Sequence, residues 1–164
     1  MHRFALLAIF AASSAIAEPV APAAHPPAIS DLKIGLANFA QQQVYQEATR
    51  VTYHENGSCK VGAVFQPCLQ WGLRFGFRDI PAGAALKCKV AMTQASQPVA
   101  SLPESRTRTD YEWTYRFPKA QGTAFVPQYI VRNPGEAGYR EIAMKCSVAG
   151  NEAIGLTFTV DMPQ

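Results

Sequence analysis

The stretch LQWGLRFGFRD, residues 69–79, alternates large apolar side chains with small, polar or charged ones. The apolar set shares one parity and comprises Leu69, Trp71, Leu73, Phe75 and Phe77. The opposite parity holds Gln70, Gly72, Arg74, Gly76 and Arg78. Successive side chains of a strand point to opposite faces, so this pattern predicts a β-strand with one face in a core. A shift of one residue would expose Trp71 and Phe75, which fixes the register of the strand strongly.

Alternating segments of this kind recur through the chain, and helical periodicity is almost absent. We expect strands within residues 31–39, 50–55, 58–65, 69–79, 86–92, 110–117, 124–131, 139–148 and 153–160. Between 40 and 49 we expect irregular chain, and the alternative there is one or two helical turns. The eight segments from residue 50 onward form the body of the domain, and a single sheet built from seven or eight such strands would leave an apolar face in water. The sequence therefore predicts an all-β protein in which two antiparallel sheets pack face to face as a sandwich.

Glycine and proline punctuate these segments. Asn56-Gly57 is a strong two-residue hairpin signal and predicts that residues 50–55 pair with 58–65; with Ser58 it also matches a glycosylation sequon. The IPAG turn at residues 80–83 is expected to connect the strand at 69–79 to the one at 86–92. Pro127 makes its segment an edge strand or a bulged one. Gly150-Asn151 predicts the turn of a terminal hairpin.

The N-terminus has the pattern of a secretory signal peptide at residues 1–17. Arg3 precedes an apolar stretch of about nine residues, and Ala15-Ile16-Ala17 fits the small-x-small cleavage rule. Residues 18–29 are rich in proline and alanine and predict an extended tether, because proline cannot donate to a strand ladder. Residues 30–164 then form a single sandwich domain. We expect an exported bacterial protein, periplasmic or secreted, without a membrane span.

The overall charge is small. The formal net charge is +3, and removing Arg3 with the signal peptide leaves +2. That value gives no support for a nucleic-acid partner.

The four cysteines fit an oxidising compartment. Of the three possible pairings we expect Cys59–Cys68 and Cys88–Cys146, the second joining two apolar strands like the inter-sheet bridge of immunoglobulin domains. The alternative is a zinc site built from Cys59, Cys68 and His54. Its spacing fits no common zinc motif.

The segment GLRFGFRDIPAGAALKCKV resembles a group of short bacterial secreted domains of unknown function with an immunoglobulin-like β-sandwich. The matching residues are Gly72, Phe75, Gly76, Phe77, Pro81 and Gly83, and AIGLTFTV is similar to the closing strand of the group. The resemblance spans about residues 32–160. The extra cysteines and the long connection at 94–110 depart from it. It implies the fold and no particular activity.

Catalytic constellations are weak in this sequence. Asp110 and Glu112 share the outward parity of one strand, about 7 Å apart by strand rise, and that spacing could serve a glycosidase. Two solvated carboxylates on a strand are also commonplace. His54 lies beside a turn with no evident partner. We therefore expect no enzyme activity, no cofactor and no metal.

A basic surface is the stronger candidate site. Arg74 and Arg78 would share a face with Lys87 and Lys89 if their strands pair through the IPAG turn. Gly72 and Gly76 would let a ligand approach that face closely. Arg106 and Arg108 lie nearby in sequence, beside Tyr111 and Trp113. The alternative is an ordinary solvated sheet face with long side chains.

These observations support three hypotheses about function. The first is a non-catalytic module that binds a protein or an anionic polymer in the cell envelope. The second is an inhibitor or immunity-like protein that places its 94–110 loop in an enzyme cleft. The third is a carbohydrate-active enzyme that uses Asp110 and Glu112.

Overall fold

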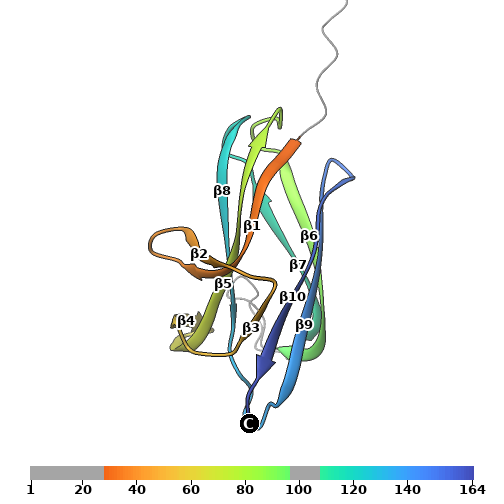
Figure 1. Cartoon of the computed structure of the whole chain (residues 1–164). Helices are drawn as coiled ribbons and strands as arrows, with labels where there is room; N and C mark the ends of the chain where they lie inside the picture. Colours follow the sequence, from red (N-terminus) through yellow and green to blue (C-terminus); the bar gives the residue numbers. More distant parts are fainter. Residues whose placement is uncertain (1–27, 97–107) are drawn as a thin grey trace, which may run out of the picture.

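The computed structural model describes residues 28–96 and 108–164, which form a β-sandwich (Figure 1). Its strands are β1 Ala28–Asn38, β2 Gln43–Glu47, β3 Arg50–Thr52, β4 Gly57–Val61, β5 Val64–Arg78, β6 Ala85–Ser96, β7 Arg108–Arg116, β8 Gly122–Ile130, β9 Gly138–Val148 and β10 Asn151–Met162. The predicted signal peptide, most of the tether and Arg106 lie outside the described residues. β1 begins at Ala28 and so includes the last two residues of the expected tether.

The strands divide into two sheets that form the layers visible in Figure 1. In the first sheet, β5 pairs with β1, β4 and β8, and β2 extends β1. The second sheet has the order β3-β10-β9-β6-β7. The pair β3–β10 is parallel, and the other pairs are antiparallel. The predicted sandwich is therefore confirmed.

The register predicted for residues 69–79 is also confirmed. All five apolar residues of that set are buried, whereas Arg74 and Arg78 are exposed. Trp71 stacks on Phe158 of β10 with ring centroids 4.4 Å apart, so an aromatic pair joins the two layers at the centre of the core. Burying large apolar side chains such as these contributes about 1.5–3 kcal/mol each.

The predicted Asn56-Gly57 hairpin is wrong. β3 and β4 lie in different sheets, and the chain crosses between the layers at this point. Neither residue has positive φ; instead the Asn56 side chain bonds the backbone N and O of Gln70, while the Gln70 side chain packs where a Cβ of residue 57 would be. The hairpin forms at Gly62, with φ of 61°, and splits the expected strand 58–65 into β4 and the start of β5.

One short strand, β2, was not expected, and β3 is shorter than the strand predicted within residues 50–55. β2 lies within the region predicted to be irregular, and its five residues are mostly exposed. β3 has three residues and pairs with the end of β10. β2 carries no alternation long enough to be distinguished from loop.

The IPAG turn does not pair β5 with β6. It carries the chain from the first sheet to the second, where β6 lies between β7 and β9. Both predicted disulfides are present. However, Cys88 and Cys146 are direct partners on the adjacent strands β6 and β9, with Cα atoms 4.0 Å apart. The expected inter-sheet bridge is therefore wrong, because this bond links two strands of one sheet. Two inward-facing cysteines can be neighbours on adjacent strands or lie opposite one another across the core, and the sequence pattern does not distinguish the two cases.

The prediction for Pro127 is confirmed, and the terminal hairpin forms with a shift of one residue. β8, which contains Pro127, pairs with β5 alone among the described strands and is an edge strand. The β9–β10 turn lies one residue earlier than expected, at Ala149 and Gly150, and both have positive φ as a type I′ turn requires.

The β8–β9 connection contains a carboxylate that is buried with an arginine of β9. Arg140 is completely buried and donates from Nε to Oε1 of Glu136 over 2.9 Å. Glu136 Oε2 also accepts from the backbone N of Asn133. Such a buried pair holds the connection in place, because removing either partner would leave the other charge buried without a counter-ion.

Candidate binding groove

The predicted basic face is divided between the two sheets. Arg74 and Arg78 project outward from β5 in the first sheet, whereas Lys87 and Lys89 project from β6 in the second. The four cations therefore stand on opposite outer faces of the molecule. The prediction depended on pairing of β5 with β6 across the IPAG turn, and these two strands lie in different sheets.

The glycines beside Arg74 are also covered. A Cβ at Gly72 would meet the backbone O of Val126 at 2.8 Å and the ring of Phe125 at 3.2 Å. A Cβ at Gly76 would lie 2.7 Å from Oγ of Ser30. These glycines admit side chains and backbone of this chain, so they do not offer the close approach to a ligand that the sequence suggested.

The lysines of the second sheet have mixed surroundings. Lys89 lies directly opposite Lys145 on β9 and opposite Glu112 on β7, with which it forms an exposed ion pair of 3.6 Å. Such a pair contributes about 0–1 kcal/mol. Glu112, placed in a glycosidase pair by sequence reasoning, is thus one partner of a surface salt bridge, and Asp110 is likewise exposed. The backbone of Arg108 starts β7, but its side chain is not among those described.

His54 and Asn56 both have local partners. His54 is exposed, and its Nδ1 lies 3.0 Å from the carbonyl O of Thr52. The Asn56 Nδ2 donates to the hydroxyl of Tyr45 and to the carbonyl of Gln70. The sequon nitrogen is therefore engaged in the fold.

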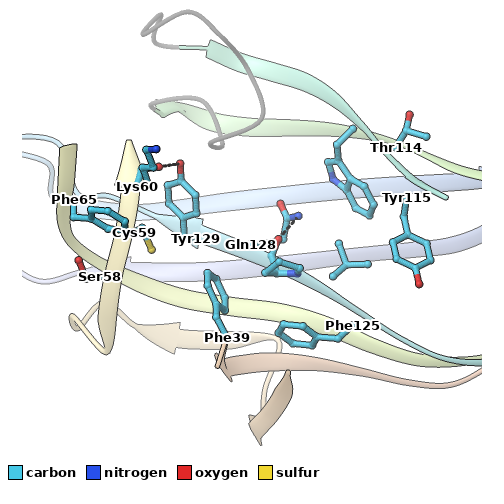
Figure 2. Close-up of a pocket in the computed structure, with 13 residues that line it drawn as sticks. Phe39, Ser58, Cys59, Lys60, Phe65, Thr114, Tyr115, Phe125, Gln128 and Tyr129 are labelled. Atoms are coloured by element: carbon cyan, nitrogen blue, oxygen red, sulfur yellow. Dashed lines mark hydrogen bonds between the residues drawn. The ribbon is translucent and has the colours of Figure 1, made fainter. Parts of the chain in front are cut away.

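The structure instead shows an apolar groove of about 490 Å³ beside the edge strands β7 and β8 (Figure 2). Six aromatic residues line it: Phe39, Phe65, Trp113, Tyr115, Phe125 and Tyr129. They come from the end of β1, from β5, and from both edge strands. Phe39 and Phe125 meet edge to face, with centroids 6.3 Å apart. Lys60 is the one charged residue in the described lining.

Two polar side chains of this groove, Gln128 and Tyr129, are already bonded within the protein, whereas the indole Nε1 of Trp113 is buried without a hydrogen-bond partner among the described residues. Gln128 accepts from the hydroxyl of Tyr111 and donates to the carbonyl of Pro127. The hydroxyl of Tyr129 donates to the carbonyl of Lys60. Burial raises the pKa of the Tyr111 phenol, which keeps it a neutral donor. The groove can therefore offer aromatic surface and the Trp113 indole N–H to a ligand, whereas Gln128 and the Tyr129 hydroxyl are already engaged.

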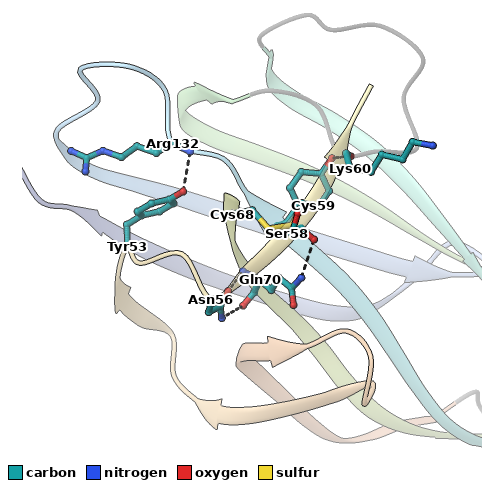
Figure 3. Close-up of a disulfide and its surroundings, with 9 residues drawn as sticks. Tyr53, Asn56, Ser58, Cys59, Lys60, Cys68, Gln70 and Arg132 are labelled. Carbon is teal, nitrogen blue, oxygen red and sulfur yellow. Dashed lines mark hydrogen bonds between the residues drawn. A yellow bond between two sulfur atoms is a disulfide. The ribbon is translucent and has the colours of Figure 1, made fainter. Parts of the chain in front are cut away.

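The β4–β5 hairpin borders the groove and carries an exposed apolar tip. Val64 is 62% exposed and Phe65 is 72% exposed. The Cys59–Cys68 disulfide joins the two strands of this hairpin (Figure 3), and both cysteines are buried with Val131. Val64 and Phe65 therefore extend the apolar surface of the groove, and contiguous exposed apolar surface is a feature of interaction sites.

No family model matches the chain, and no curated protein does either. Among solved structures, the sandwich is similar to an immunoglobulin-like protein from Pseudomonas aeruginosa, with a TM-score of 0.55. The match covers 84% of this chain and 98% of the other at 13% sequence identity. The fold is immunoglobulin-like. At this identity the likeness concerns the fold alone.

The groove of this immunoglobulin-like domain was not predicted from the sequence. On β8 the buried parity includes Val126 and Gln128, and the outward parity carries Phe125 and Tyr129. Aromatic residues at positions that should be polar were the available signal. Phe39 could not be placed, because it follows β1 in a region with no clear period.

Proposed function

We propose that this protein is a non-catalytic binding domain that holds an apolar segment of a partner protein in the groove beside β7 and β8. The observation that carries the proposal is the continuity between the six aromatic side chains of the groove and the exposed tip at Val64 and Phe65. Protein interfaces concentrate aromatic anchors in such hollows, and a few of them supply most of the binding energy.

The bonding in the groove favours a peptide over a sugar. A saccharide needs several hydrogen bonds together with stacking, but Gln128 and the Tyr129 hydroxyl are committed to intramolecular partners. Apolar side chains would bury the aromatic surface without breaking these bonds. Lys60 at the rim favours a carboxylate next to the apolar residues of the peptide.

A random peptide library displayed on phage and selected on the disulfide-bonded protein tests the proposal. We expect enriched peptides with apolar or aromatic residues and an acidic neighbour, and loss of their binding in Phe65→Ser and Phe125→Ala. Tyr139→Ser is a matched control, since Tyr139 is 52% exposed and lies outside the groove. Selected peptides that bind both groove variants as well as the control would refute the proposal, as would saccharides that displace them.

An inhibitor role is the second candidate. We propose the β4–β5 hairpin, in place of the loop at 94–110, as the segment that enters the enzyme cleft. A disulfide-held strand pair with Phe65 at its tip presents a preorganised projection that could enter an enzyme cleft. Titrating envelope hydrolases with the protein tests this role. Inhibition should require Phe65 and be lost in Phe65→Ser, and inhibition that is equal in both proteins would exclude the hairpin.

We further propose that the chain is exported. Two disulfides are compatible with an extracellular protein, and the described residues contain no helix long and apolar enough to cross a membrane. Expression of the full chain in a Gram-negative host should yield a periplasmic protein that begins at Glu18. A product retaining residues 1–17 would contradict the predicted signal peptide.

A further inference from the structure

One long sheet edge of this domain has no proline and no register shift over seven consecutive residues, although it carries charged side chains. β7 pairs with β6 and with no other described strand, so its second side is an edge of nine residues. From Asp110 to Arg116 it runs in unbroken register with β6 and contains no proline. Exposed edges of this kind are templates for another strand.

The other edges are interrupted. β8 carries Pro127 near its middle. β1 changes register between Ser30 and Lys33, where Asp31 has a φ of 49°, and β10 changes register between Glu152 and Ile154. The remaining edge strands, β2, β3 and β4, have five residues or fewer. Bulges, prolines and short strands protect edges, and β7 has none of them between residues 110 and 116.

The side chains of β7 complement a second copy of the same strand. An antiparallel pair centred on Trp113 would place residue 110 opposite 116, 111 opposite 115, and 112 opposite 114. Each exposed Asp110 then faces an exposed Arg116 of the other copy, and Tyr111 faces Tyr115. Opposite charges and aromatic pairs that lie directly across from one another stabilise a sheet. Centring the pair on Glu112 would instead place two carboxylates face to face.

We propose that this protein forms a twofold homodimer by antiparallel pairing of β7 with β7 of a second copy, in the register that pairs Asp110 with Arg116. In such an isologous interface each contact between two different residues occurs twice, once on either side of the twofold axis. The half-buried rings of Trp113 and Tyr115 gain cover from the second copy. The dimer does not depend on the ligand of the groove, although Trp113 and Tyr115 border both.

Charge reversal tests the dimer and its register. Light scattering coupled to size-exclusion chromatography should show a dimer for the disulfide-bonded wild-type protein, dissociating as salt increases. Asp110→Arg and Arg116→Asp should each be monomeric, because each places like charges opposite one another twice. An equimolar mixture of the two variants should restore a dimer, and so should the double variant D110R/R116D.

Glu112→Arg is the matched control, since it makes the same change in charge at a position that faces Thr114 in the proposed register. It should remain dimeric. Unchanged circular dichroism will verify that every variant is folded. A wild-type protein that is monomeric at its highest soluble concentration would overturn the proposal, and so would single variants that stay dimeric or a mixture that stays monomeric. Peptide selection is read out separately, so failure of the groove proposal leaves this result intact.

Discussion

The two disulfides of this domain have different surroundings, and the difference separates stability from binding. Cys88–Cys146 joins neighbouring strands in the middle of the second sheet, where Met144 and Val148 are also buried. Cys59–Cys68 joins the strands of a hairpin whose tip exposes Val64 and Phe65. The first bond lies in the core that defines the fold. The second braces a hairpin with an exposed apolar tip, the part of the molecule on which the proposed binding role depends.

The largest expected effect is loss of the bond in the core. Its loop spans 58 residues, and by the chain-entropy estimate the variant C88A/C146A should lose about 4 kcal/mol of unfolding free energy. That is a large share of the roughly 5–15 kcal/mol that holds a typical domain together. Urea denaturation followed by tryptophan fluorescence measures the loss. A smaller loss than in C59A/C68A would reverse the comparison.

Loss of the hairpin bond should cost less stability and more binding. The loop spans 9 residues, and C59A/C68A should lose about 2.7 kcal/mol by the same estimate. The peptides selected on the groove should bind this variant weakly, because its tip is no longer held in one conformation. Isothermal titration calorimetry compares the two double variants. Equal affinity of C59A/C68A and wild type would show that the brace is irrelevant to binding.

Asn56 should be the next most important element of the hairpin region. Its side chain bonds the backbone N and O of Gln70, so Asn56→Ala leaves both groups unpaired. We expect a loss of about 2 kcal/mol, measured by urea denaturation. Asn56→Asp retains the acceptor for the Gln70 N–H and should lose less, and equal losses would contradict the proposed roles of the two bonds.

The smallest expected effect concerns the pair Arg50–Asp161, which ties β3 to β10 by two hydrogen bonds of 2.7 and 2.8 Å. The bond from Arg50 lowers the pKa of Asp161. A lowered carboxyl pKa stabilises the fold above the unfolded-state pKa, and that contribution disappears as pH falls through the folded-state pKa. The difference in unfolding free energy between wild type and Asp161→Asn should therefore be present at neutral pH and vanish in acid. A difference that persists in acid would contradict this pair as the cause.

The sequence predicted the layered fold because a period of two over residues 69–79 and 139–148 leaves little choice of which face is buried. It also predicted both disulfides. It could not assign strands to sheets, since Cys88 and Cys146 face inward whether they are neighbours or opposite one another. The same ambiguity placed Arg74 and Lys87 on one face. Pairing between distant segments depends on the whole core, and no local pattern encodes it.

The groove was missed for a related reason. Its walls come from four separate parts of the chain, and Phe39 and Phe65 have no local period that distinguishes them from core residues. Phe125 and Tyr129 did break the alternation of their strand. Aromatic residues on the outward parity of an edge strand are therefore a practical indicator of a binding surface in sequences of this type.

The engagement of Asn56 has a consequence for producing the protein. Oligosaccharide transfer in a eukaryotic secretory pathway acts on the nascent chain, before Gln70 and Tyr45 are in place to occupy the Asn56 amide. A glycan added then would sit on the nitrogen that the finished sheet requires as a donor. Yeast or mammalian secretion should therefore give poorly folded material that Ser58→Ala rescues, whereas a host without this glycosylation should need no such change.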